Sequence, residues 1–251
     1  MIQSVDRALK ILDFLKTNPK GYGVTEVATH LQIAKSSAHR LLATLVEHNY
    51  VQQNENQDYV LGLKFIEMNN YVVSNLDILT TAHPLIEQLC NDIDEIVHLV
   101  QLRDFEVVYI DKVENNQSIR IYSQIGRTAP LYCTGVGKVI LAYKEPKFIE
   151  SYLNYQKEFK QYTPYTVKNE QELFEKLKRI QQQGYGYDDQ EHELNIRCIA
   201  APIFDYQHNV QHAISVTGPI HRMTNEKVQQ IIPKLLNCTE QISKNWGYIP
   251  K

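Results

Sequence analysis

The first 66 residues place the strongest constraint on the fold, because three amphipathic helical patterns follow one another there with little room between them. Apolar residues recur at three- and four-residue spacing from Ser4 to Thr17, which predicts a first helix that ends before Pro19. Thr25 is expected to cap a short second helix. After a tight turn, a third and longer helix is predicted from Lys35 to about Asn49.

Two short strand patterns follow the third predicted helix. Tyr50 to Gln52 and Tyr59 to Leu61 flank a polar loop, so we expect a β-hairpin. Three helices, the last two joined by a tight turn, and then a hairpin is the order of a winged helix-turn-helix, whose third helix enters the major groove of DNA. A module for protein–protein interaction has the same order of elements and stays an alternative.

The start of the third predicted helix carries side chains that can donate hydrogen bonds to DNA. Arg40 is the best candidate for reading a base, because its planar guanidinium can meet two acceptors of a guanine at once. The alternatives are that Arg40 only tethers the backbone, or that it forms an ion pair with Glu26 or Glu47 inside the domain. The predicted DNA contacts, with Lys35 and Arg7 expected at phosphates, are Arg7, Lys35, Ser36, Ser37, His39 and Arg40.

The charge of the chain supports DNA binding only locally. The net charge is −3 for the whole chain, so no general basicity indicates a nucleic-acid partner, and residues 1–66 carry seven basic and six acidic side chains. The predicted wing from Gln52 to Asp58 contains no Lys or Arg. Any phosphate contacts of the wing are therefore expected from the neutral side chains of Asn54, Asn56 and Gln57.

The rest of the chain mixes strand and helix patterns. Residues 62–94 read as helical, with Pro84 expected to interrupt or restart the second segment. Hairpins together with segregated helices predict an α+β domain around an antiparallel sheet. The predicted strands are 96–103, 105–113, 118–122, 197–204 and 210–216, and the predicted helices are 136–143, 147–153, 170–183 and 225–246.

The cysteines and the amino terminus indicate a reduced, cytoplasmic protein. No two cysteines form a CxxC pair, so we expect neither a structural zinc site nor a disulfide framework. The amino terminus has no signal pattern, and no apolar run approaches 18 residues, so we expect no membrane contact. The four cysteines, 43, 65 and 40 residues apart, are Cys90, Cys133, Cys198 and Cys238.

A stretch late in the chain resembles a known family. Residues 184–205 match, in register, the signature of the IclR family of bacterial transcriptional regulators, and residues 4–12, 35–45, 59–62 and 135–138 resemble other blocks of that family. The resemblance spans nearly the whole chain. The residues that carry the signature are Gly184, Asp188, Glu191, Cys198, Ile199, Ala200, Ile203, Phe204 and Asp205.

The resemblance implies an organisation and a function. It implies a winged helix-turn-helix domain over residues 1–66, a linker helix over 67–80, and an effector-binding and oligomerisation domain with a GAF-like fold over 81–251. Family members are dimers or dimers of dimers, mostly repressors, whose affinity for operator DNA changes when a small metabolite binds, often an organic or aromatic acid. The chain is therefore expected to be a regulator without catalytic residues, metal or cofactor.

The effector site is expected where Gly135 and Gly137 open a helix, because free backbone N–H groups there favour a carboxylate. Glycines for tight packing are the alternative, and Tyr132 and Val139 rule out a P-loop. The hydroxyls of Ser215 and Thr217 are expected on one face of a strand. The resemblance implies that Leu131 and Ile196 lie on an apolar wall of the effector site. The full set of effector contacts that it implies is Leu131, Gly135, Val136, Asp188, Ile196, Cys198, Ser215 and Thr217.

Some alternatives stay open at this point. Asp188 near an anionic effector would have to meet a hydroxyl, be protonated, or cap local backbone instead. Glu191 to Glu193 contain acidic and His side chains that could bind a metal, although exposure to solvent is the simpler interpretation. A cysteine-dependent hydrolase using Cys133 or Cys198, and a redox sensor using Cys198, are the competing functions.

Overall fold

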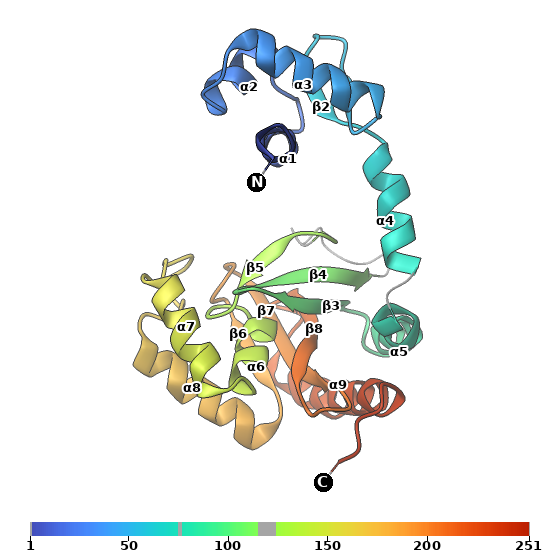
Figure 1. Ribbon diagram of the computed structural model, residues 1–251. Coiled ribbons are helices and arrows are strands. Elements are labelled where there is room, and N and C mark those ends of the chain that lie inside the picture. Colours follow the sequence, from blue (N-terminus) through green and yellow to red (C-terminus); the bar gives the residue numbers. More distant parts are fainter. Residues whose placement is uncertain (1, 75–76, 115–123, 251) are drawn as a thin grey trace. The chain divides into compact units, whose positions relative to one another are not determined.

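The computed structural model describes residues 2–74, 77–114 and 124–250 (Figure 1). The chain divides into two compact units, residues 1–76 and 77–251, and each is described by itself. The helices and strands of each unit follow the predicted order, with differences at the edges of the sheet. No described helix has the length and apolar character needed to cross a membrane.

The first unit consists of three packed helices, a hairpin and a further helix. Its apolar core joins α1, α2, α3 and the hairpin, and includes Ile11, Leu42 and Val51, each almost fully buried. In order, the elements are α1 (Gln3–Leu15), α2 (Val24–His30), α3 (Lys35–Glu47), β1 (Val51–Gln53), β2 (Tyr59–Leu61) and α4 (Lys64–Ser74).

The hairpin is held in place by pairing and by one close approach. β1 and β2 are antiparallel, with Val51 opposite Leu61, and Tyr22 forms an isolated bridge to Tyr59. Gly62 follows β2, and a Cβ atom there would lie 2.2 Å from the carbonyl oxygen of Asn49. Only glycine therefore lets the chain leave the hairpin along this path.

The start of α2 differs from the prediction. Thr25 lies inside the helix, and Gly23 is the N-cap residue. The backbone N–H of Gly23 donates to the Glu26 carboxylate over 2.8 Å, which satisfies one of the free groups at the helix start. The capping hydrogen bond at the start of α2 is thus made by the carboxylate of Glu26, whereas the sequence predicts one made by the hydroxyl of Thr25.

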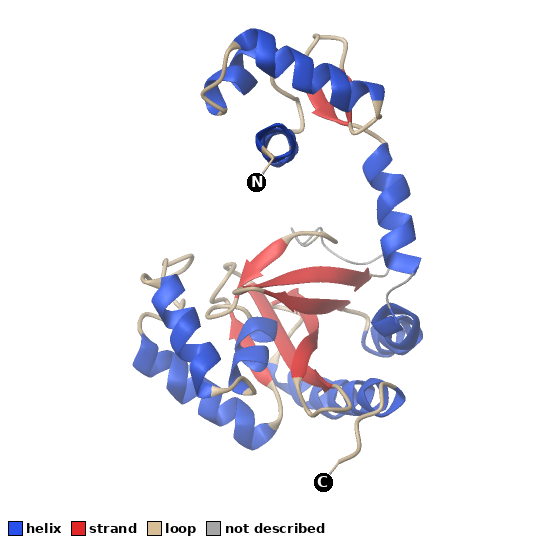
Figure 2. Ribbon diagram, in the orientation of Figure 1, coloured by secondary structure: helices blue, strands red, loops and turns tan. Residues whose placement is uncertain are grey.

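The second unit is built on a six-stranded antiparallel sheet with the order β5-β4-β3-β8-β7-β6. Helices cover both faces of this sheet (Figure 2): α5 and α9 pack together on one face, and α6 and α8 on the other. The strands are β3 (Ile96–Arg103), β4 (Glu106–Val113), β5 (Thr128–Pro130), β6 (Gly186–Asp189), β7 (Ile196–Phe204) and β8 (Val210–Pro219). The helices are α5 (Asp77–Ile93), α6 (Gly135–Ala142), α7 (Pro146–Gln156), α8 (Glu170–Gln183) and α9 (Asn225–Asn245).

Three predictions in this unit need correction or fall outside the description. Pro84 lies inside α5, which runs on as one helix, so the expected interruption is wrong. The strands β5 and β6 were not predicted, because they are three and four residues long and lack an apolar alternation. The strand predicted over 118–122 lies outside the described residues.

Candidate functional site

The exposed edge of α3 is the first candidate site. Ala38 and Leu42 on the opposite side of the helix are fully buried in the core, which fixes the side that faces solvent. An exposed row of donors at a helix start is what contacts with phosphates and base edges require. The predicted DNA contacts on this edge, all exposed except the half-buried Ser37, are Lys35, Ser36, Ser37, His39 and Arg40.

The two arginines predicted to contact DNA differ in their surroundings. The guanidinium of Arg40 makes no ion pair with any residue in the described parts of the chain, so the alternative pairing with Glu26 or Glu47 is absent there. Arg7 is half-buried on α1 and lines a groove beside Gln32, in the turn between α2 and α3. Arg40 is therefore a cation without an ionic partner among the described residues. It lies on the exposed edge of α3 (Lys35 to Arg40), which we call the reading edge, whereas Arg7 lies beside the turn between α2 and α3.

The loop of the hairpin uses one of its predicted contact residues for its own structure. The side-chain oxygen of Asn54 accepts hydrogen bonds from the backbone N–H groups of Asn56 and Asp58, each with a donor–acceptor distance of 3.0 Å. Its amide nitrogen donates to the carbonyl oxygen of Lys20 over 2.9 Å. Since both ends of this side chain are bonded, the exposed Asn56 and Gln57 are the two of the three predicted wing contacts that remain open to a partner.

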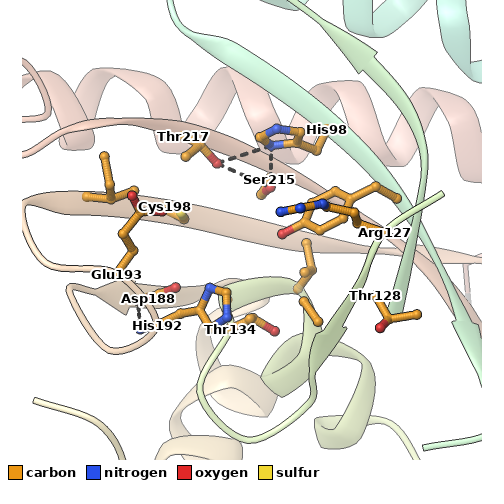
Figure 3. A pocket seen from close by; sticks show the side chains of 15 residues that line it. His98, Arg127, Thr128, Thr134, Asp188, His192, Glu193, Cys198, Ser215 and Thr217 are labelled. Atoms are coloured by element: carbon orange, nitrogen blue, oxygen red, sulfur yellow. Dashed lines mark hydrogen bonds between the residues drawn. The ribbon is translucent and has the colours of Figure 1, made fainter. Parts of the chain in front are cut away.

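A cavity of about 100 Å³ in the second unit is the second candidate site. It lies on the α6 side of the sheet, where side chains of several strands converge (Figure 3). Leu131 does not line it and packs in the apolar core instead. The predicted effector contacts that the structure brings together here are Gly135, Val136, Asp188, Ile196, Cys198, Ser215 and Thr217.

The start of α6 forms one wall of this cavity. The hydroxyl of Thr134, the N-cap residue, accepts from the backbone N–H of Gly137 over 3.1 Å and donates to the carbonyl of Pro130 over 2.6 Å. A Cβ atom on Gly137 would lie 2.4 Å from the backbone of Leu131, so this glycine serves packing. Gly135 lines the cavity. The two glycines therefore have different roles, since Gly135 borders the candidate site and Gly137 allows close packing.

A buried polar cluster forms the opposite wall. The Nδ1 atom of His98 lies 3.4 Å from the Ser215 hydroxyl and 3.3 Å from the Thr217 hydroxyl (Figure 3). Burial is the main cause that lowers the pKa of His98, to about 3, so the imidazole is neutral at physiological pH. This wall therefore offers neutral donors and acceptors to a ligand.

Asp188 lines the cavity and also caps backbone. One of its carboxylate oxygens accepts from the N–H groups of Glu191 and His192, over 2.7 and 3.2 Å. Burial raises the pKa of Asp188 to about 7, against the lowering effect of Lys138. The capping role and a protonated carboxyl, which the sequence left as alternatives, are thus compatible in one residue.

Glu191 is not a surface residue, contrary to the simpler interpretation of its sequence. It is 3% exposed, and its Oε1 atom is hydrogen-bonded to the ammonium of the buried Lys138 on α6. Lys176 on α8 approaches the same oxygen to 3.2 Å. Within the described residues, no group of three or more potential ligands forms a metal site.

Sequence reasoning missed about half of the cavity wall. Arg127 supplies a cation beside β5, and Tyr109 projects from β4, which the sequence could not place next to the start of α6. The one signal available was strand alternation, which puts residues two apart on one face. The lining residues that were not predicted are His98, Tyr109, Arg127, Thr128, Ala129, Thr134, His192 and Glu193.

Two family models match this chain. The model described as "IclR helix-turn-helix domain" matches residues 4–55, and the one described as "Bacterial transcriptional regulator IclR C-terminal" matches residues 70–244. The chain belongs to the IclR family. The signature and the fold order on which the resemblance was based are confirmed.

Relatives and solved structures of the IclR family cover almost the whole chain. The regulator KdgR of Escherichia coli is 33% identical over 98% of this chain and 94% of its own length, and the repressor IclR of Escherichia coli is 29% identical over 98% and 90%. The crystal structure of Thermotoga maritima IclR superposes with a TM-score of 0.80 at 34% identity, covering 99% of this chain and 100% of that one. A regulator from Rhodococcus reaches a TM-score of 0.88 at 25% identity, covering 98% of each chain.

Membership in the IclR family decides between a transcriptional regulator and a hydrolase. The chain is a transcriptional regulator with a helix-turn-helix domain and an α+β carboxy-terminal domain, and it is not an enzyme. The thiol chemistry agrees: burial raises the pKa of Cys133 and of Cys198 well above the usual range. Both side chains are thiols at neutral pH, whereas a nucleophilic cysteine needs the thiolate.

Proposed function

We propose that this IclR-family regulator is a repressor that binds operator DNA through the exposed edge of α3 and responds to a small organic acid. The observation that carries the proposal is the composition of the cavity at the start of α6. Arg127 and a helix N-terminus converge there with neutral hydroxyl and imidazole groups, and Asp188 and Glu193 are the acidic side chains of the wall. A carboxylate that also carries a hydroxyl or carbonyl group meets complementary groups on both walls.

The size of the cavity narrows the effector class. A volume of about 100 Å³ is small against the roughly 300 to 1,000 Å³ of sites that hold drug-sized ligands, which favours a short aliphatic acid over a large aromatic one. Asp188 is compatible with such a ligand because a pKa of about 7 lets its carboxyl be protonated beside the anion. In that state Asp188 is a donor and no longer repels the ligand.

Self-association is part of the proposal. The first unit exposes an apolar groove of about 950 Å³ along α1, α3 and α4, lined by Leu12, Leu41 and Phe65 among others. Val5 and Leu9 on its rim are 52% and 57% exposed. A second copy covering this groove would pair two reading edges for a palindromic operator, as dimers of helix-turn-helix proteins do.

The proposed organisation follows the sequence: residues 1–66 bind DNA, 67–80 connect, and 81–251 bind the effector and, together with the groove of the first unit, assemble dimers or dimers of dimers. Because operator DNA is the proposed partner, the proposed location is the cytoplasm. No contact with a membrane and no cofactor enters this function.

Fluorescence anisotropy with labelled fragments from the upstream region of its own operon tests the proposal. The full-length chain should bind one fragment at low salt, and short hydroxy or keto acids should change its affinity by about 5- to 150-fold, the usual size of allosteric coupling. Arg127→Gln should abolish the response to the acid while leaving DNA binding in its absence unchanged. Failure to bind any fragment would refute the DNA-binding function, and a response that survives Arg127→Gln would refute the acid site.

A further inference from the structure

The second unit contains another cavity, of about 300 Å³, which is separate from the one at the start of α6. Its walls come from α8, the edge strand β6, the start of β7 and the first turns of α9. It shares no lining residue with the first cavity. Four basic and two acidic side chains line it, so the wall carries an excess of positive charge.

Internal ion pairs neutralise only part of this charge. Arg197 is fully engaged, since it forms two hydrogen bonds of 3.0 Å with the Asp189 carboxylate and others with the start of α9. Lys138 is paired with Glu191. Arg179 is exposed on α8 and makes no ion pair with any described residue. Lys176 is shared between Glu191, at 3.2 Å, and Glu172, at 3.9 Å. Arg179 is therefore the cation of this wall that can bind an anion, with a planar pair of donors.

One buried atom indicates that the ligand also donates a hydrogen bond. Lys138 and Lys176 both contact the Oε1 atom of Glu191, and among the described residues its Oε2 atom has no partner. Glu191 is 3% exposed and lines this cavity. A buried carboxylate oxygen without a donor is costly, so a group that occupies the cavity and supplies one is stabilised there.

The start of α9 adds to the attraction for an anion. This helix is 21 residues long, and Asn225, Val228 and Gln229 in its first two turns line the cavity. The amino-terminal end of a helix carries partial positive charge. The helix end, Arg179, Lys176 and Glu191 thus all line the same cavity.

We propose that this second cavity binds a small anion that also carries a hydroxyl group. The anionic group binds Arg179 and Lys176 near the start of α9, and the hydroxyl donates to Oε2 of Glu191. A carboxylate and a phosphate share this chemistry, and the experiment below distinguishes them. The site is separate from the one proposed for the acid, because the two cavities share no lining residue.

The two cavities share one short segment of chain, which gives the second site a consequence. Along this segment Asp188, His192 and Glu193 line the first cavity, whereas Asp189 and Glu191 line the second. The backbone N–H of Glu191 donates to the Asp188 carboxylate over 2.7 Å. A ligand that moves Glu191 therefore changes the position of Asp188, and the two ligands should influence each other's affinity.

Calorimetric titration of the full-length chain at low salt tests the site with two matched pairs of probes. Glycerol 3-phosphate is compared with propyl phosphate, and glycerate with propionate, so that each pair differs only in its hydroxyls. The hydroxylated member of at least one pair should bind about tenfold more tightly than its partner, and the pair that does so identifies the anionic group. No binding of any probe at about 10 mM, or equal binding within both pairs, would overturn the proposal.

Paired variants locate the ligand. Arg179→Gln should weaken binding of the hydroxylated probe by about 10- to 100-fold, whereas Lys178→Gln, one residue away and outside the cavity, should not. Gln229→Glu should also weaken it, and Gln230→Glu should not. Thr217→Val alters only the first cavity and should leave this binding unchanged. Loss with Thr217→Val but not with Arg179→Gln would place the ligand in the first cavity and refute the second site.

Discussion

The reading edge of α3 and the effector cavity use the same kinds of side chain in opposite ways. On α3, Ser36, His39 and Arg40 are exposed, and Arg40 has no ionic partner among the described residues. In the cavity, Ser215 and His98 are almost fully buried and bonded to each other. In the proposed function, serine and histidine contact DNA in one unit and form a fixed, neutral binding wall in the other, and their burial distinguishes the two sites.

This contrast has an energetic consequence. A side chain on the reading edge contributes nothing to the core, so its loss should cost DNA affinity and leave stability unchanged. A buried polar side chain of the second unit is part of a hydrogen-bonded network, so its loss should cost stability first. The predictions below test this division, beginning with the largest effect.

Breaking the buried ion pair should have the largest effect. Lys138→Met removes the close partner of Glu191 and should lower the free energy of unfolding by about 3 to 5 kcal/mol, because it leaves a buried carboxylate poorly compensated. Chemical denaturation of the full chain measures this change. The control Lys178→Met, at an exposed position on α8, should change stability by less than about 0.5 kcal/mol.

The double variant Lys138→Met with Glu191→Leu sharpens the test. Removing both charges should restore much of the stability that the single change loses, since a pair of apolar side chains leaves no charge without a partner. A loss of less than about 1 kcal/mol in the single variant would contradict the contrast, because it would mean that Lys176 alone compensates Glu191.

The next effect belongs to the reading edge. Arg40→Ala should weaken operator binding by about 1 to 3 kcal/mol and relax base preference at one position, with the thermal midpoint unchanged. Lys35→Ala is the matched comparison, because a phosphate contact should weaken all sequences alike and reduce the salt slope by about one. If Arg40→Ala behaves like Lys35→Ala, then Arg40 binds the backbone of DNA and does not read a base.

The same contrast explains what the sequence could predict. Periodicity gave α8 with the bounds observed, and it gave the hairpin to within a residue, because a surface helix and a hairpin carry local patterns. It also identified the outward face of α3, since Ala38 and Leu42 mark the inward one. The reading edge is a local structure, so a local pattern is enough to find it.

The effector cavity is assembled from distant parts of the chain, and only part of it was found. Family resemblance supplied the residues near α6, β7 and β8. Tyr109 lies on β4 and Arg127 directly precedes β5, and no local pattern reveals the place of these two strands in the sheet. The sequence predicts a surface position for Glu191, because its partner Lys138 is 53 residues away along the chain. Leu131 was placed on the cavity wall, although its backbone lies against Gly137 in the core.

A third prediction concerns the pH dependence of effector binding. Burial raises the pKa of Asp188 to about 7, and an anionic effector favours the protonated carboxyl. Affinity for an organic acid should therefore fall as the pH rises through 7, by up to about tenfold for each pH unit above the pKa. His192 and His98 do not supply this change, because burial lowers the pKa of both.

Asp188→Asn tests the assignment without removing the cap. The amide oxygen can still accept from the N–H groups of Glu191 and His192, but it no longer titrates. Calorimetric titration between pH 6 and about pH 8 should show a nearly flat affinity for this variant. A slope equal to that of the unaltered chain would assign the pH dependence to another group.

The smallest effect should come from adding a basic side chain to the wing, which has none. The wing is without Lys or Arg, and Asn56 is exposed at its tip, so Asn56→Lys should add one phosphate contact. Binding should strengthen alike for all sequences, and the salt slope should steepen by about 0.9, whereas Gln207→Lys in an exposed loop of the second unit should change neither. An unchanged slope for Asn56→Lys would mean that the wing stays away from the duplex, so that α3 and its neighbours alone make the DNA interface.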